Sequence, residues 1–206
     1  LQVLVIERRN KIASLTTAAA TGAFRLQHDN AEELALVREG VDLYLNFAER
    51  TGLDDWDLGI LQQGYLFCSR TDSSAAKARD LVELQRDFGL DDVELLSGDE
   101  ARARWPYLAP SIVQARFRAG DGFIDQVALA RGYATASSRA SQIPGATGSG
   151  HAQYALSVEV TGFIRGESGA ITGVETSRGG VHTPAVMIAA GPWSGNVAAL
   201  AGLALR

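Results

Sequence analysis

Val3-Leu4-Val5-Ile6-Glu7 is the stretch that decides the fold of this chain. Its four apolar residues follow one another without a polar residue between them. Such a run predicts a strand buried on both faces, as in a parallel sheet covered by helices. A second apolar run, Ala185-Val186-Met187-Ile188-Ala189-Ala190, leads into the turn Gly191-Pro192 and predicts a second buried parallel strand with Met187 in the core. Together the two runs indicate an α/β fold.

The acidic residue Glu7 comes at the carboxyl end of the first predicted strand. In a dinucleotide-binding fold, a carboxylate at this position accepts hydrogen bonds from a ribose hydroxyl group. The phosphate-binding turn G-x-G-x-x-G of such folds lies about 20 residues earlier, whereas this chain begins at Leu1. We therefore interpret the chain as a fragment of a larger nucleotide-binding enzyme. The alternative is that Glu7 only caps or solvates the turn that follows the strand.

Composition restricts the classes of function. Hydrophobic residues make up 46% of the 206 residues and charged residues 21%, which is typical of a soluble globular protein. The net charge of −5 argues against nucleic acid and an anionic membrane surface as partners. No apolar run approaches the ~20 residues that span a bilayer. The three histidines lack metal-ligand spacing, so we predict no metal site. The chain has a single cysteine, Cys68, which is compatible with a cytoplasmic protein. We expect its side chain to be buried and to pack against apolar neighbours.

Small and hydroxylated residues dominate the stretch 13–25, which follows the basic turn after the first strand. It ends in Gly22-Ala23-Phe24-Arg25. Small side chains allow a backbone to approach a flat or charged ligand closely, and hydroxyl groups can bond phosphates and ring heteroatoms. The alternative is a small-residue loop packed against a neighbouring helix.

Hydrophobic periodicity and capping residues predict the rest of the secondary structure. Asn30 with Glu33 begins a helix that we expect to continue to Gly52, with Tyr44 and Phe47 in the core. Ser97 with Glu100 forms a second helix start. The remaining expected helices are residues 73–88, 126–139 (capped by Asp125) and 195–200 (capped by Ser194), and the expected strands are 65–68, 93–96, 112–118, 156–163, 171–176 and 181–184, the last three as an antiparallel meander.

Motifs at both ends of the chain carry a resemblance to a known family. Glu7-Arg8, followed by Thr16-Thr17 and Gly22-Ala23-Phe24-Arg25, resembles the FAD-dependent oxidoreductases of the D-amino-acid oxidase and glycine–sarcosine oxidase family. The sarcosine oxidase β-subunit-like branch often reads Thr-Thr-x-x-x-x-Gly-Gly-x-Arg, and here Ala23 replaces the second glycine. The run 185–194 resembles the family pattern V-V-x-A-A-G-x-W-S. The resemblance covers nearly all of residues 3–203, with matching elements in matching order.

The resemblance implies FAD as the cofactor and gives individual residues roles. It places Arg25 near the reactive face of the flavin, where a positive charge would stabilise reduced flavin or superoxide. It places Thr16 and Thr17 along the phosphates or ribityl chain, and gives the backbone of Val160 to the adenine edge. The full implied cofactor-binding set is Glu7, Arg8, Thr16, Thr17, Thr21, Gly22, Val160, Ala189, Ala190, Gly191 and Trp193.

The resemblance also implies a domain organisation. Residues 1–60 and 120–206 would form an incomplete α/β, Rossmann-like FAD-binding domain of parallel strands plus an antiparallel meander. Residues 61–119 would form part of an interleaved α+β substrate domain that acts as a lid. The amino-terminal glycine motif and the carboxyl-terminal half of the family fold would then lie outside these 206 residues.

The implied activity is oxidation of a C–N bond of a small amine or amino acid by hydride transfer to flavin. An oligomer or a partner subunit is compatible with this reading. One alternative is an inactive fragment that cannot hold FAD and whose exposed sheet edge drives association. Another is a nicotinamide-dependent dehydrogenase, against which we note that the antiparallel meander is typical of flavoproteins. The sequence determines neither the substrate nor the choice between oxidase and dehydrogenase.

Overall fold

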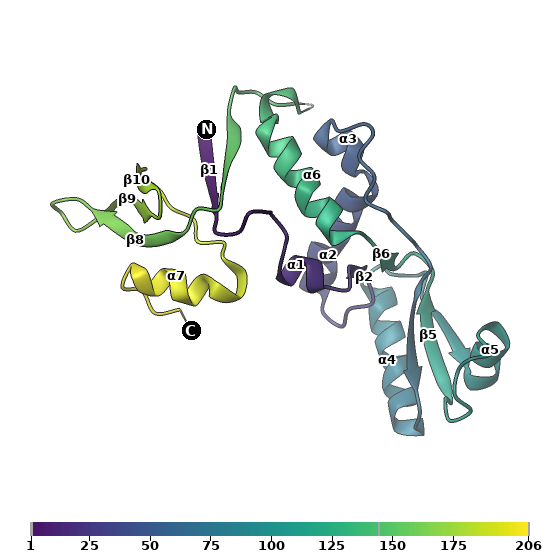
Figure 1. Cartoon of the computed structure of the whole chain (residues 1–206). Coiled ribbons are helices and arrows are strands. Elements are labelled where there is room, and N and C mark those ends of the chain that lie inside the picture. The colour runs from purple at the N-terminus through teal and green to yellow at the C-terminus, as the bar shows by residue number, and fades with distance from the viewer. Residues whose placement is uncertain (1, 144, 206) are drawn as a thin grey trace. The chain divides into compact units, whose positions relative to one another are not determined.

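The structure, a computed structural model, describes residues 2–143 and 145–205 and divides into two compact units (Figure 1). Unit 1 consists of the described residues of 1–14, 137–141 and 146–206, and unit 2 of those of 15–136 and 142–145. The expected division into residues 1–60 with 120–206 and residues 61–119 concerns contacts with cofactor and substrate, and it stays a prediction. Within the described ranges, no helix is long and apolar enough to cross a membrane.

Unit 1 contains the parallel pair that the first apolar run predicts. Strand β1 (Gln2–Glu7) pairs with β7 (His151–Leu156), and Val3 lies opposite Ala152 while Glu7 lies opposite Leu156. The expected burial on both faces is not found, because Val3 and Leu4 are 44% and 41% exposed. In the described part of the chain β7 is the only strand paired with β1, so its other edge lacks a cover.

The antiparallel meander of unit 1 is confirmed. It consists of β8 (Val160–Arg165), β9 (Ile171–Thr176) and β10 (Gly179–His182), in the order β10-β9-β8. The expected single strand over residues 156–163 is wrong. The chain breaks between β7 and β8 at Ser157, whose φ of 55° is incompatible with extended backbone.

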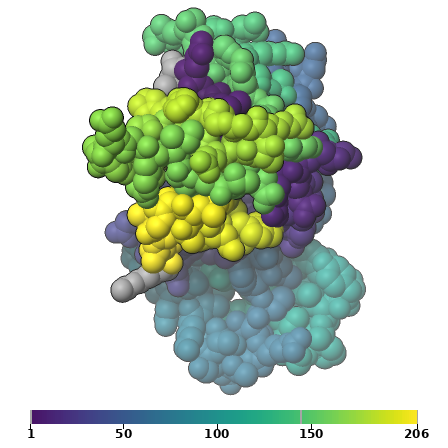
Figure 2. Space-filling model, turned by 60° about the vertical axis from the view of Figure 1, so that its left-hand side comes forward, coloured from purple at the N-terminus to yellow at the C-terminus, as the bar shows by residue number. Residues whose placement is uncertain are grey.

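Helix α7 (Ser194–Leu200) lies beside the meander, as Figure 2 shows for the yellow helix and the green strands. The Arg165 Nη2 donates a hydrogen bond of 2.7 Å to the carbonyl of Ala201, just past the end of the helix. A short 3₁₀ helix, η2 (Gly191–Trp193), precedes α7. The expected N-cap at Ser194 is wrong, because Ser194 is the first residue of α7 and Trp193 precedes it without a side-chain cap.

The second apolar run does not form the expected strand. Residues 185–190 have no regular secondary structure and pair with no strand in the described part of the chain. Met187, expected in the core, is 89% exposed and Val186 is 39% exposed. The physical reason is that an extended segment is stable as a strand only beside a hydrogen-bonding neighbour, and none lies there.

Unit 2 holds most of the helices and an antiparallel sheet with the order β3-β5-β4. Strands β2 and β6 form a separate two-stranded antiparallel sheet. The element bounds of unit 2 are α1 (Thr16–Ala19), β2 (Ala23–Phe24), α2 (Ala31–Leu45), α3 (Phe47–Thr51), β3 (Tyr65–Ser69), α4 (Asp72–Asp87), β4 (Glu94–Ser97), α5 (Gly98–Arg104), β5 (Gln114–Arg118) and β6 (Gly122–Phe123). Helix α6 (Gln126–Ser138) begins in unit 2 and ends in unit 1, and the short 3₁₀ helix η1 (Ala140–Gln142) has its first two residues in unit 1.

The core of unit 2 packs α2 and α4 against residues next to its strands. One cluster joins Leu34 and Val41 of α2 with Val82 of α4 and with Phe24 and Leu26. A second cluster surrounds Phe47, which is 2% exposed, so the expected core position of this aromatic residue is confirmed. These apolar contacts hold the segment 22–27 at a fixed place on the sheet.

The helix caps that the sequence predicts are largely present in the structure. The Asn30 side chain accepts the Glu33 N–H at 2.9 Å, and Ser97 with Glu100 forms a complete capping box. The predicted helix over residues 30–52 is interrupted at Asn46, between α2 and α3. Cys68 is exposed, contrary to expectation, because it alternates to the face of edge strand β3 opposite to Phe67.

Candidate functional site

The carboxyl end of β1 carries Glu7, and the chain between β7 and β8 crosses this end. The Glu7 Oε1 accepts the Arg9 N–H at 2.7 Å. The Glu7 carbonyl accepts the Val158 N–H at 3.1 Å, and the Arg9 carbonyl accepts the Ser157 N–H at 2.9 Å. The positive φ of Ser157 turns the chain into this crossing. The carboxylate is therefore held beside the start of β8.

Val160 is the first residue of β8 and lies two positions after Val158 in the sequence. The Arg8 Nη1 lies 3.8 Å from the Glu159 Oε1, and both side chains are more than half exposed, so this ion pair contributes little stability. The structure thus brings Glu7, Arg8 and Val160 to one place. A half-buried carboxylate at the end of a parallel strand offers the acceptor oxygens that the hydroxyl groups of a ribose need.

The small-residue corner Ala189–Gly191 is open. Gly191 has a φ of 55°, and a Cβ added to it would meet no atom within 4 Å. Trp193 is 41% exposed. Because residues 185–190 pair with no strand in the described ranges, sheet pairing does not bring Ala189, Ala190, Gly191 or Trp193 to Glu7.

The first small-residue stretch, in unit 2, is tightly held at its end. Thr16 and Thr17 begin the single-turn helix α1, and Thr21 is exposed. The Gly22 carbonyl accepts the Ile124 N–H at 2.9 Å, and a Cβ on Gly22 would lie 2.2 Å from the Ile124 carbonyl oxygen. Only glycine fits this place, since its φ of 69° is left-handed as well. The corner therefore packs against the chain returning through β6.

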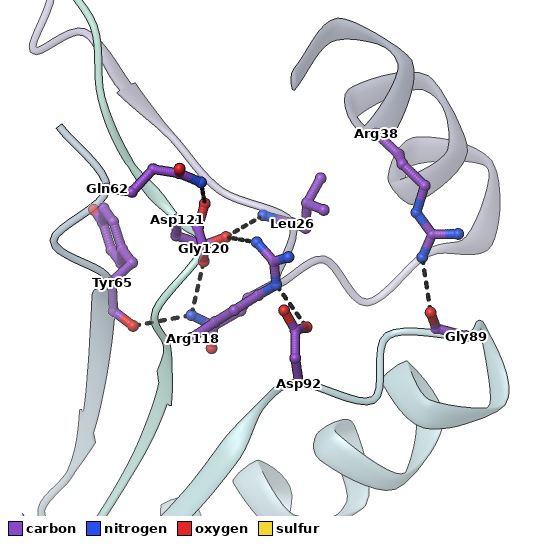
Figure 3. A network of polar contacts seen from close by, with 10 residues as sticks. Leu26, Arg38, Gln62, Tyr65, Gly89, Asp92, Arg118, Gly120 and Asp121 are labelled. Carbon is purple, nitrogen blue, oxygen red and sulfur yellow. Dashed lines mark hydrogen bonds and ion pairs between the residues drawn. The ribbon is translucent and has the colours of Figure 1, made fainter. Parts of the chain in front are cut away.

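A buried carboxylate, Asp121, holds the segment that carries Arg25. Asp121 is fully buried, and its Oδ1 accepts the Leu26 N–H at 2.9 Å and the Arg118 Nη1 at 2.7 Å. Its Oδ2 accepts the Gln27 Nε2 at 3.0 Å. Figure 3 shows Arg118 reaching both Asp121 and Asp92. Residues 26–27 and 118–121, which are far apart in the sequence, are thus joined at one carboxylate.

Sequence reasoning missed this role of Asp121. The signal was present, since Asp121 stands between Gly120 and Gly122 and three residues after Arg118. Burial alone would lower the pKa of Arg118, but hydrogen bonds to Asp92 and Asp121 raise it above its usual value. Arg118 therefore keeps its charge and neutralises the buried carboxylate.

Arg25 lies against two aromatic rings of β3. Its guanidinium carbon is 5.9 Å from the centre of the Tyr65 ring and 5.6 Å from that of Phe67. The Arg25 Nε is buried and has no hydrogen-bond partner. An arginine with an unused donor, stacked on aromatic rings beside a rigid polar anchor, is suited to hold negative charge. The aromatic residues Tyr65 and Phe67 were not among the predicted site residues.

Comparisons with known proteins concern the fold and the family of the chain. The model of the family described as FAD dependent oxidoreductase (DAO) matches residues 1–206. L-proline dehydrogenase from P. horikoshii superposes with a TM-score of 0.82 at 25% identity, over 100% of this chain and 50% of that one. Glycine oxidase from Geobacillus kaustophilus gives 0.80 at 25%, over 99% and 52%, and glycine oxidase from Bacillus cereus gives 0.73 at 26%, over 96% and 51%.

The chain spans about half the length of these solved structures. No curated protein matches. The predicted fold class, α/β with parallel and antiparallel sheets that correspond to part of a flavoenzyme, is confirmed by the superpositions.

Proposed function

The chain belongs to the FAD dependent oxidoreductase family, and on that premise we propose that it forms part of an enzyme that oxidises a C–N bond of a small amine or amino acid. The similar solved structures support this choice, because two are glycine oxidases and one is an L-proline dehydrogenase by name. The family also favours FAD over a nicotinamide cofactor. When bound, FAD would accept the hydride, while the protein binds, orients and places charge.

The observation that carries the proposal is the position of Glu7. Its carboxylate stands at the carboxyl end of a parallel strand, where a dinucleotide-binding sheet holds a ribose. The Arg9 N–H fixes one carboxylate oxygen, which orients the other. The Val158 N–H bonded to the Glu7 carbonyl keeps β8, and with it Val160, at the same place. We therefore propose Glu7 as the ribose ligand and the backbone of Val160 as the neighbour of the adenine.

The other proposed cofactor contacts follow the family resemblance. Arg8, Ala189, Ala190, Gly191 and Trp193 belong to unit 1. The open space at Gly191 supports close approach of a ligand, because it imposes no steric barrier there.

In unit 2, the proposed contacts are Thr16, Thr17, Thr21 and Gly22. We further propose that Arg25 stabilises negative charge that develops during the reaction. Its buried Nε supports this role, because no hydrogen bond within the described part of the chain uses this donor.

FAD titration tests the proposal. FAD fluorescence is followed while the 206-residue chain is added, and we expect weak, saturable quenching. We expect tight binding and a yellow protein only for a version extended at both ends toward the length of its relatives. Glu7→Gln should weaken the binding about tenfold, because a hydrogen bond to a charged group is lost.

Glu83→Gln is the matched control, since Glu83 is an exposed glutamate on α4 of unit 2. It should bind FAD as the unchanged chain does. Equal affinity of the Glu7→Gln and Glu83→Gln variants would contradict the ribose role of Glu7. Quenching that does not saturate would contradict a FAD site in unit 1.

A further inference from the structure

A hollow of about 300 Å³ opens on unit 2 where the chain that follows α5 meets β3 and β5 (Figure 1). Its lining is uncharged and half of it is aromatic. The lining residues are Gln63, Gly64, Leu66, Trp105, Tyr107 and Phe117. A pocket of this composition, which we call the aromatic hollow, suits an uncharged group with an apolar ring.

The floor of the aromatic hollow is rigid. Gly64 has a φ of 84°, and a Cβ added to it would lie 2.1 Å from the Phe117 ring, so only glycine lets the chain pass here. The guanidinium carbon of Arg104 lies 4.4 Å from the centre of the Phe117 ring and 4.7 Å from that of Trp105. The two oxygens of Glu94 accept hydrogen bonds from Arg104 at 3.0 and 3.1 Å. The two rings are therefore held in place before anything binds.

Tyr107 stands at the edge of this hollow and is 81% exposed. It follows Pro106 in a turn that a backbone hydrogen bond of 3.1 Å closes across residues 105–108. Proline at the second position of a turn stiffens it. The Arg102 Nη1 donates hydrogen bonds to two carbonyl groups of residues 110–112, which holds the end of the same loop. A large ring is thus presented on rigid backbone, so a partner that covers it loses little conformational entropy.

The charges next to the aromatic hollow are compensated within the chain. Arg104, which stacks on two lining rings, forms an ion pair with Glu94. Arg102, which holds the loop that carries Tyr107, forms an ion pair with Asp99. Although the chain has a net charge of −5, these pairs make repulsion between two copies of this surface small.

We propose that this surface is an interface between two copies of the chain, in which Tyr107 of each copy inserts its ring into the aromatic hollow of the other. The protruding ring and the hollow lie side by side, so one twofold axis makes both contacts at once, as an isologous interface requires. The exposed amide of Gln63 can hydrogen-bond to the inserted hydroxyl group. Aromatic side chains that fill preformed pockets are typical hot spots of interfaces.

Sedimentation velocity of the 206-residue chain over a range of concentrations tests the inference. We expect the mass to move from that of one chain toward that of two. Tyr107→Ser should weaken the dimer at least about tenfold, because it removes both inserted rings. Its urea unfolding should match that of the unchanged chain, since the side chain is in solvent. Met187→Ser changes an exposed apolar residue of unit 1 and should leave the dimer unchanged.

A complementation experiment tests the geometry itself. Gln63→Arg introduces a long charged side chain at the aromatic hollow and should also give a monomer. A 1:1 mixture of the Tyr107→Ser and Gln63→Arg chains should form a mixed dimer. The reason is that Tyr107 of the second chain meets the open hollow of the first, which restores one of the two contacts.

Three outcomes would overturn the inference. A chain that stays monomeric at every concentration would leave the aromatic hollow to a different partner. Association that Met187→Ser weakens and Tyr107→Ser does not would place the contact at the open segment of unit 1. A mixture that stays as monomeric as its two components would exclude insertion of Tyr107 into the hollow. The proposed function does not enter this experiment, because FAD titration of the same samples is a separate measurement.

Discussion

Two corners of small residues behave differently in this protein. The corner at Gly22, in unit 2, and the corner at Gly191, in unit 1, both have a left-handed glycine next to alanines. The Gly22 corner is bonded to Ile124 and leads to Phe24, which is 6% exposed. The Gly191 corner follows Met187, which is 89% exposed, and has open space around it.

The difference shows what small residues specify and what they leave open. They permit left-handed backbone and close approach, but they do not determine which neighbour approaches. At Gly22 the neighbour is β6, placed there by the buried carboxylate Asp121. At Gly191 no strand pairs with the preceding segment in the described part of the chain.

The largest expected effect compares the apolar residues next to the two corners. Phe24→Ala should lower the free energy of unfolding by about 4 kcal/mol, because it leaves a cavity in the cluster around α2 and α4. Met187→Ala should change it by less than about 0.5 kcal/mol, since the side chain is already in solvent. Urea unfolding followed by tryptophan fluorescence measures both. A large loss for Met187→Ala would mean that residues 185–190 pack in solution after all.

The next effect concerns the anchor that fixes only the first corner. Asp121→Asn should lower the free energy of unfolding by about 3 kcal/mol, because it leaves Arg118 without its buried partner and sets an amide N–H against a donor. Asp91→Asn, at an exposed position, serves as the control and should be nearly neutral. Both are measured by urea unfolding. A neutral Asp121→Asn would show that apolar packing alone holds the Gly22 corner.

The smallest effect compares the glycines themselves. Gly22→Ala should cost about 2 kcal/mol or more, because the Cβ meets the Ile124 carbonyl and the backbone is left-handed. Gly191→Ala should cost about 1 kcal/mol, from its left-handed backbone alone. Thermal unfolding of the two variants gives the ranking. Equal losses would indicate that the space around Gly191 is filled in solution.

Much of the fold could be predicted from the sequence because it depends on local residue patterns. Apolar continuity predicted β1, alternation and glycine turns predicted the meander, and the capping residues Asn30 and Ser97 marked two helix starts. The same reasoning failed for residues 185–190. An apolar run indicates that a segment can be buried. Burial also requires a neighbouring segment, and the run itself does not identify that neighbour.

The candidate site divides in the same way. Glu7 could be proposed from sequence because a strand and the acid at its end are adjacent in the chain. The pairing of Arg25 with Arg116 could not, because 90 residues separate them and no local pattern joins them. Both arginines contact Phe67. The residue pattern of its strand did not indicate which face of the strand points inward.

By itself, the sequence determined the kinds of elements, their order and the family to which they belong, since these depend on side-chain periodicity and short motifs. The tertiary structure decided which elements touch. It buried Asp121 and set two arginines on one aromatic ring, and it left Met187 in solvent. The physical reason is that propensity and capping act over a few residues, whereas burial and charge pairing depend on whichever distant segments fold together.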